Sequence, residues 1–253
     1  MTAAIVAIYR YPVKGLGDEA LERVTLAPDA HVPGDRRWAV AHGGSAWDAA
    51  ARAWVARRNF VQTAHTPELA RLVTSLDGDR VTVSAPDREP ITARPDDAAE
   101  AALLSAWLEG VAGHRQPGPY QIARLPDGAL TDVADAHVSL LSDASLRALS
   151  ERAGKPLERR RFRGNLWIDG LAPWEEFDLV GREIVLNGAA GPVRLRVTER
   201  IERCAAPSAS PKSGHRDVDV VPVLRAAYGH ADFGVYAQVV SGGEIALGAS
   251  LSR

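Results

Sequence analysis

Short β-like runs, each ended by a turn signal, constrain the fold of this chain more than any other feature. Ala4–Tyr11 ends at a proline, and the runs Leu72–Ser75 and Arg80–Ser84 flank Asp77-Gly78, a strong hairpin signal. The regular strand–helix alternation that builds a doubly wound parallel sheet is missing. The pattern predicts a mainly β fold with helical insertions (α+β) in which the strands form barrels.

Further strand-like runs continue to the end of the chain. We expect strands at Glu22–Leu26, Arg36–Ala41, Tyr120–Leu125, Asn165–Ile168, Arg182–Leu186, Val193–Ile201, Gly234–Val240 and Glu244–Leu247. The run 193–201 alternates apolar and polar residues, as a half-buried strand does. We expect one hairpin to turn at Asn187-Gly188 and the last one at Ser241-Gly242-Gly243.

Three helices are expected, because capping residues and glycines bound three Ala- and Leu-rich or apolar segments: Asp96–Leu108, Ser142–Ala153 and Val220–Tyr228. Gly43–Arg58 stays open between a helix and a long loop, since its two tryptophans stand seven residues apart. Gly113–Pro119 is the best linker candidate, and it divides the chain into domains 1–115 and 116–253.

Composition excludes several classes of function. The net charge of −2 over 253 residues gives no electrostatic case for binding nucleic acid. No run of 18 apolar residues and no signal-peptide pattern is present, so we expect no membrane association and a cytoplasmic protein. A single cysteine excludes an intrachain disulfide and an iron–sulfur cluster held by four thiolates of this chain.

That cysteine, Cys204, follows the strand-like run 193–201 and stands beside Arg203, with Arg200 close by. A free cysteine is most often a small buried hydrophobe, which is one interpretation of this residue. The other is functional, because neighbouring guanidinium groups favour a thiolate and a thiolate is a soft metal ligand. A Cys–His hydrolase that uses His215 or His230 also stays open, although no local motif supports it.

Several cationic residues fall where strand-like runs begin or end, next to glycine or proline. They are Lys14, Arg36, Arg37, Arg159, Arg160, Arg161, Arg163 and Arg203. Each alone is typical of a solvated surface charge. Together they could converge on the mouth of one barrel and bind a phosphate, because arginine offers a planar fork and lysine a point charge.

The motifs Y-P-V-K-G, G-D-R-R-W, R-F-R-G-N, E-R-C, S-P-K-S-G and F-G-V-Y-A-Q-V-V-S-G-G-E-I occur in this order along the chain. The sequence therefore resembles MOSC-domain proteins that carry an N-terminal MOSC β-barrel domain, including bacterial relatives of the mitochondrial amidoxime-reducing component. The resemblance implies an N-terminal β-barrel-like domain followed by a MOSC β-barrel. It also implies binding of the molybdenum cofactor (molybdenum–molybdopterin) and reduction of hydroxylamines, amidoximes and N-hydroxylated bases.

The resemblance further implies which residues form the site. Cys204 would be the catalytic residue and the thiolate ligand of molybdenum, and the cofactor-binding residues would be Lys14, Gly15, Arg36, Asp135, Arg163, Asn165, Arg203 and Cys204 itself. Because the chain cannot hold a four-thiolate cluster, electrons would come from a separate protein such as a ferredoxin or a flavin reductase. A sulfur carrier with a persulfide on Cys204 and a non-catalytic cofactor carrier are the alternatives.

Three positions depart from the family pattern. Gly15 stands where relatives often have serine, Ser210 where an aspartate often opens the following loop, and Ala249 where an aspartate is common. These departures bear on whether the site is complete enough for catalysis.

Overall fold

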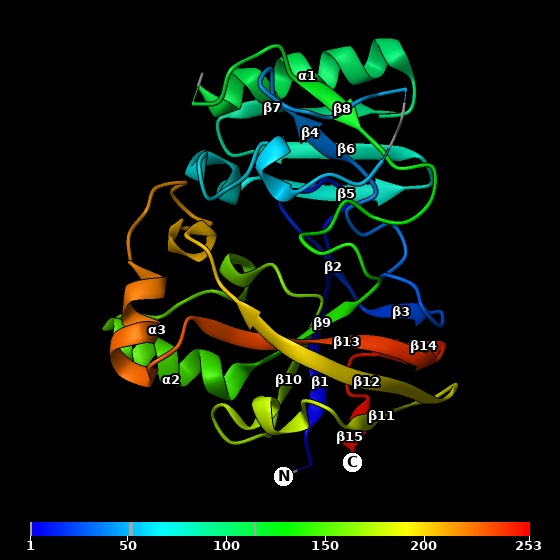
Figure 1. Cartoon of the computed structure of the whole chain (residues 1–253), viewed down its shortest axis with the longest axis vertical. Coiled ribbons are helices and arrows are strands. Elements are labelled where there is room, and N and C mark those ends of the chain that lie inside the picture. Colours follow the sequence, from blue (N-terminus) through cyan, green and yellow to red (C-terminus); the bar gives the residue numbers. More distant parts are fainter. Residues whose placement is uncertain (1, 51–52, 114) are drawn as a thin grey trace.

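The protein is organised around a closed barrel of seven strands, shown in the lower half of Figure 1. The computed structural model describes residues 2–50, 53–113 and 115–253. Around the barrel the order is β10-β9-β13-β12-β11-β15-β1, and the antiparallel pairing of β1 with β10 closes it. Its strands are β1 (Ala4–Arg10), β9 (Val138–Ser142), β10 (Leu166–Asp169), β11 (Glu183–Gly188), β12 (Gly191–Glu202), β13 (Asp232–Ser241) and β15 (Ser250–Ser252).

A second unit lies above the barrel in Figure 1 and contains two small sheets covered by helix α1 (Ala98–Ala112). One sheet joins β5 (Val73–Asp77), β6 (Arg80–Ala85) and β7 (Arg88–Ala93), and the other pairs β4 (Ala39–Ala41) with β8 (Gln121–Ala123). The expected hairpin is present as β5–β6, where Asp77 pairs with Arg80. Asp97 caps α1 by accepting from two backbone N–H groups, and the left-handed Gly113 ends it.

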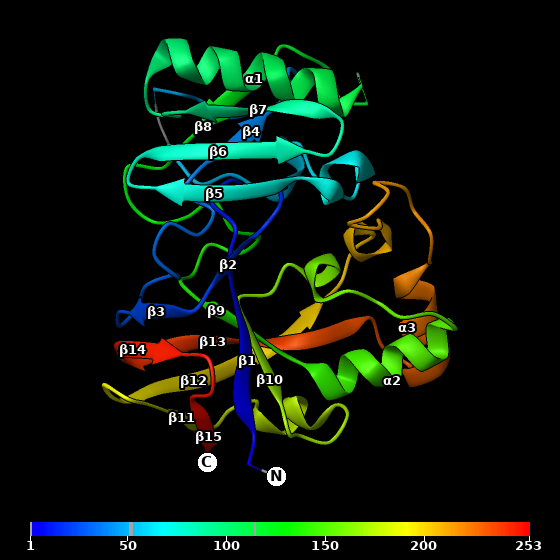
Figure 2. The same ribbon diagram turned by 180° about the vertical axis from the view of Figure 1, so that it is seen from behind.

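Helices α2 (Asp143–Ala153) and α3 (Val220–Tyr228) pack together on the outside of the barrel, as Figure 2 shows from behind. Their apolar residues share a cluster with the rings of Phe162, Trp167 and Phe233. In the described part of the chain these are the only α-helices besides α1. The structure thus confirms the predicted mainly β fold with helical insertions.

Two strands lie in a different unit from the one that their position in the sequence predicts. The strand β1 at the start of the chain belongs to the barrel, whereas β8 belongs to the upper unit. Two short strands, β2 (Glu19–Leu21) on the outer edge of β1 and β3 (Arg23–Leu26), lead the chain upward. The predicted boundary between 115 and 116 is therefore a division of the sequence that the hydrogen-bonded sheets do not follow.

The expected last hairpin was wrong. Strand β14 (Gly243–Ala246) leaves β13 and pairs antiparallel with β3, with Gly243 opposite Leu26. Glycine permits this, because a Cβ at Gly242 would lie 2.4 Å from the carbonyl oxygen of Leu26. The turn after β11 also moves: the strand runs through Gly188, which pairs with Gly191, so the two residues between them form the turn.

Two other expectations are corrected or resolved. The predicted strand Arg36–Ala41 begins only at Ala39, since Arg36 has φ 48° and cannot continue a strand. The described residues of Gly43–Arg58, which exclude 51–52, form a loop with no α-helix, and only Arg57 and Arg58 at its end enter a short 3-10 helix. Trp47 packs against Phe60 and anchors this loop. In the linker, residue 114 lies outside the described residues, while the carbonyl of Pro117 accepts from Gly43 N at 2.6 Å.

The turn pattern missed four strands, namely β2, β7, β9 and β15. β2, β7 and β15 are edge or closing strands with few buried apolar residues, whereas β9 is a barrel strand that is buried along its whole length. Across the described ranges, no helix combines the length and the apolar character needed to span a bilayer.

Candidate functional site

A cavity of about 100 Å³ lies where the barrel meets the upper unit. Loops after β1 and before β4 reach it from one side, and the start of β10 and the end of β12 from the other. Seven of the eight predicted site residues line it: Lys14, Gly15, Arg36, Arg163, Asn165, Arg203 and Cys204. Residues that are far apart in the sequence thus meet in one hollow.

We call Lys14, Arg36 and Arg163, three cations that line this cavity, its floor. Lys14 is buried, with only 5% of its surface exposed. Its backbone N–H donates to the carbonyl of Trp38 at 2.7 Å, which anchors the loop after β1 to the upper unit. Gly15 makes the next turn possible: its φ is +83°, and a Cβ there would lie 2.4 Å from the carbonyl oxygen of Val61. The Lys14 ammonium contacts the carboxylate of Asp132 at 2.5 Å.

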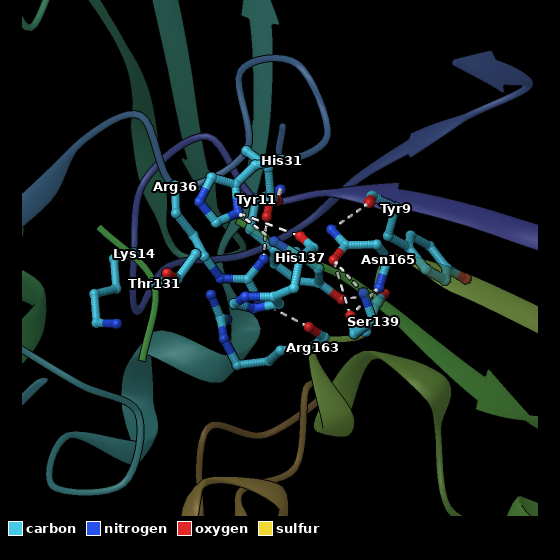
Figure 3. A network of polar contacts seen from close by, with 12 residues as sticks. Tyr9, Tyr11, Lys14, His31, Arg36, Thr131, His137, Ser139, Arg163 and Asn165 are labelled. Atoms are coloured by element: carbon cyan, nitrogen blue, oxygen red, sulfur yellow. Dashed lines mark hydrogen bonds and ion pairs between the residues drawn. The ribbon is translucent and has the colours of Figure 1, made fainter. Parts of the chain in front are cut away.

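Arg36 and Arg163 lie over the buried ring of Tyr11, with guanidinium carbons 4.9 and 4.6 Å from its centroid (Figure 3). Arg36 pairs with Asp35 and donates from Nη2 to the carbonyl of Arg163 at 2.9 Å. Arg163 donates from Nη1 to the carbonyl of Leu16. Both arginines have positive φ values, 48° and 52°, so the backbone is held in the left-handed region where they meet.

The Nη2 atom of Arg163 is buried and has no hydrogen-bond partner among the described residues. Burial, together with the neighbouring charge of Arg36, lowers the pKa of Arg163 from its ordinary value. A buried donor without a partner is rare in native proteins and calls for an explanation such as a missing ligand. Of Lys14, Arg36 and Arg163, only Arg163 pairs with no carboxylate among the described residues.

Arg203 has a different role, because its side chain is committed to the backbone. Nη1 donates to the carbonyl of Phe162 at 2.7 Å, and Nε donates to that of Phe233 at 2.8 Å. These two rings stack with centroids 4.1 Å apart. Burial lowers the pKa of Arg203 to about 10. Arg203 therefore fixes the end of β12, and with it the half-buried Cys204.

Asn165 ties three strands together at the barrel mouth. Its Oδ1 accepts from the hydroxyl of Ser139 at 2.8 Å, and its Nδ2 donates to the carbonyl of Tyr9 at 3.2 Å (Figure 3). The amide group of Nδ2 carries two hydrogens, and the described residues provide a partner for one of them.

Asp135, the remaining predicted residue, is exposed and does not line the cavity. Its backbone carbonyl contacts Nδ1 of His137 at 2.8 Å. The acidic residue that reaches the cations is Asp132, three positions earlier in the same loop. Partial desolvation would raise the pKa of Asp132, but the charges of Lys14, Arg36 and Arg57 outweigh it and lower this pKa to about 2, so the carboxylate is ionised at neutral pH.

Sequence reasoning also missed Arg57, His137 and Tyr236, which line the cavity. Tyr236 lies within the F-G-V-Y motif and His137 follows Asp135 in a D-A-H segment, whereas no signal pointed to Arg57. The ring of Tyr236 packs on His137 at 4.1 Å, and burial lowers the pKa of His137 to about 4, so this imidazole is neutral. A second pocket of about 460 Å³ adjoins the cavity and shares Arg57 and Tyr236 with it.

The remaining predicted cations are engaged elsewhere or within the fold. Arg37 pairs with Asp96 at 3.1 Å, Arg159 with Asp143, and Arg160 with Asp18. Arg161 lines the cavity but binds carboxylates through its whole guanidinium group.

The three departures from the family pattern have local explanations. Gly15 is required by its close approach to Val61. Ser210 accepts from the N–H groups of Lys212 and Ser213 at 3.2 and 3.4 Å, so its hydroxyl takes the turn-stabilising role that an aspartate can play. Ala249 packs in the barrel core and does not line the cavity.

Comparison with protein families decides the identity. A model of the MOSC N-terminal beta barrel domain matches residues 2–115, and a model of the MOSC domain matches residues 121–252. The chain belongs to the MOSC-domain family. This family is associated with binding of the molybdenum cofactor.

Two solved structures are similar to this MOSC-domain protein. The crystal structure of the YuaD protein from Bacillus subtilis shares 13% identity over 99% of this chain and 94% of that one, with a TM-score of 0.47. The crystal structure of YiiM from Geobacillus stearothermophilus shares 21% identity over 45% of this chain and 52% of that one, with a TM-score of 0.34. No protein of curated function matches the chain.

Proposed function

We propose that this MOSC-domain protein binds the molybdenum cofactor in the cavity and reduces N-hydroxylated compounds such as hydroxylamines, amidoximes or N-hydroxylated bases. The observation that carries the proposal is the shared cavity: the only thiol of the chain, Cys204, and the unpartnered Nη2 of Arg163 line the same hollow.

The residues present fit this cofactor. A phosphate on a pterin needs cations, and the orphaned Arg163 donor stands with Lys14 and Arg36 at the floor. Molybdenum accepts a soft thiolate, which Cys204 can provide. Among the described residues no three His, Cys, Asp or Glu side chains are grouped to hold a metal by themselves. A metal here would therefore take its remaining ligands from the cofactor.

Each residue of the chain has a part in this proposal. Lys14, Arg36 and Arg163 would hold the phosphate, and Cys204 would ligate the metal. Arg203 keeps Cys204 in place through its bonds to two backbone carbonyls. The free N–H of Asn165 would meet the pterin edge. The bound cofactor supplies two-electron redox chemistry, while the protein binds, orients and tunes it.

The overall reaction balances with two electrons and two protons. The N–O bond of a hydroxylamine breaks, the nitrogen is reduced to the amine, and the oxygen leaves as water. The electrons would come from a separate protein, a ferredoxin or a flavin reductase, since one cysteine cannot hold a four-thiolate cluster. The adjoining pocket of about 460 Å³ offers room for the small substrate.

The deciding experiment is purification from cells that make the cofactor, followed by measurement of molybdenum and pterin. We expect both in the wild type and loss of molybdenum in Cys204→Ser, with an unchanged circular-dichroism spectrum. Ala205→Ser, which places the same hydroxyl one residue further on an exposed position, is the matched control and should keep its metal. Folded wild-type protein that contains neither molybdenum nor pterin would overturn the proposal.

Two other outcomes would redirect it. Labile sulfur on Cys204 without molybdenum would indicate a sulfur carrier. Bound cofactor with no turnover of any hydroxylamine, whichever electron donor is supplied, would indicate a carrier of the cofactor.

A further inference from the structure

Two carboxylates lie among the cations of the floor, and they are held very differently. Asp35 is 4% exposed, accepts from the backbone N–H of Tyr11 at 2.7 Å and pairs with Arg36. It is part of the fold. Asp132 has a side chain that is 46% exposed, and its ion pairs are with Lys14 at 2.5 Å and Arg57 at 3.9 Å. Its carboxylate is held by the two cations, with a hydrogen bond from Lys14, and accepts from no backbone N–H in the described residues.

Asp132 also lies between the inner cavity and the adjoining pocket. It lines both the inner cavity and the adjoining pocket, as Arg57 does. The segment that carries it, between β8 and β9, has no regular secondary structure. A group that enters from the larger pocket toward Lys14 therefore meets this carboxylate first.

Lys14 depends on a neighbouring anion. Burial lowers the pKa of its ammonium group, and the charge of Asp132 is the largest influence in the opposite direction. A buried ammonium needs a partner to stay charged. A carboxylate and a phosphate crowded on one ammonium repel each other, so the two anions compete for Lys14 rather than share it.

We propose that Asp132 is the resident counterion of Lys14, and that an incoming phosphate group must displace it toward Arg57 and the adjoining pocket. This inference rests on the proposed function, because it assigns a phosphate-bearing ligand to these cations. The consequence is selectivity by charge. A singly charged carboxylate offers Lys14 nothing that Asp132 does not already provide, whereas a phosphate near neutral pH carries close to two charges.

The test uses protein purified without cofactor, with molybdenum and pterin shown to be absent. Inorganic phosphate is titrated at fixed ionic strength and pH 7.5, and the Kd is measured by calorimetry. We expect Asp132→Asn to bind phosphate about tenfold more tightly than the wild type, because the competing charge is gone. Acetate, which the wild type should reject, should bind measurably to the same variant.

Asp87→Asn is the matched control. It removes one aspartate charge from an ion pair with Arg71 at 3.0 Å, outside the cavity, and should leave the Kd for phosphate unchanged. Asp132→Glu keeps the charge and should stay within about twofold of the wild type. Should the asparagine variant fail to fold, Asp132→Ser provides the same comparison.

Equal or weaker phosphate binding by both uncharged variants would overturn the inference. So would the absence of saturable phosphate binding in the wild type and in Asp132→Asn alike. Neither result decides the proposed function, which depends on the molybdenum and pterin that the protein carries when cells supply the cofactor.

Discussion

Arg161 and Arg163 stand two residues apart, line the same cavity and are held in opposite ways. The side chain of Arg161 is 1% exposed and contacts Glu158 at 2.6 Å and Asp217 at 2.7 Å, so its charge is fully matched. Arg163 has no carboxylate, and its Nη2 has no partner among the described residues. The guanidinium group of Arg161 is thus saturated within the fold, and that of Arg163 keeps an unpaired donor among the described residues.

The difference appears in their pKa values. Burial by itself lowers the pKa of Arg161, but its bonds to Asp217 and Glu158 raise it above the ordinary value. For Arg163, burial and the charge of Arg36 lower the pKa. The fold therefore stabilises the charge of the first arginine and tolerates that of the second.

The largest expected effect compares these two residues directly. Arg161→Met should lower the free energy of unfolding by about 3 kcal/mol, because it removes the buried cation from two carboxylates, which keep only the more exposed Lys155 and Lys212. Arg163→Met should lower it by only about 1 kcal/mol, since it leaves no carboxylate unpaired and removes one hydrogen bond, to the carbonyl of Leu16. Denaturant unfolding with linear extrapolation measures both. Similar losses for the two variants would contradict the distinction.

Glu176 is a buried acidic group that, like Arg163, lacks an oppositely charged partner among the described residues. It is fully buried; Ser145 donates to its Oε2 at 2.7 Å, and its Oε1 has no partner among the described residues. Burial raises its pKa from 4.5 to about 7. Folding thus favours the protonated acid, so its contribution to stability falls as pH rises from about 4.5 to about 7 and is constant above that.

Glu176→Gln should remove this pH dependence. Relative to the wild type, the variant should gain about 2.5 kcal/mol between pH 5 and pH 8, from 1.36 kcal/mol per pKa unit. Unfolding curves at several pH values measure the difference. Glu175→Gln is the control, because Glu175 is paired with Arg253 and partly exposed, and it should show no such gain. A difference that does not vary with pH would contradict the assignment.

The smallest expected effect concerns the turn that carries Lys14 into the floor. Gly15→Ser should lower the free energy of unfolding by about 2 kcal/mol, since the residue has positive φ and a Cβ would meet the carbonyl of Val61. Gly78→Ser has a similar φ, +59°, but open space around the Cβ, and should cost about 1 kcal/mol. Thermal unfolding compares the two. Equal losses would mean that the contact with Val61 is relieved by a small backbone shift.

Much of the fold followed from local signals. All three helices were predicted, with Val220–Tyr228 correct at both ends, because caps and glycines mark their limits in the sequence. The pairing of β14 with β3 was not predictable, since it joins segments more than 200 residues apart through a close contact at Gly242. A glycine pair indicates a turn locally, whereas here it permits a crossing.

The site was predictable in composition but not in bonding. Family motifs pointed to residues that line one cavity, yet they could not show that Arg203 is committed to backbone carbonyls. Asp135 and Asp132 lie in one loop with similar neighbours, and only the path of the backbone brings Asp132 to Lys14. The roles of the predicted site residues as ligands of a cofactor stay predictions.

The place of β1 has a consequence for how the chain is made. Synthesis delivers this strand first, but its neighbours in the closed barrel are β10 and β15, which leave the ribosome about 160 and 240 residues later. Meanwhile the upper unit completes its own sheets, once β8 has emerged. Until β10 and β15 emerge, the opening strand has only the short strand β2 as a partner. Closure of the barrel must therefore wait for the last strands, and such long-range pairing is slow.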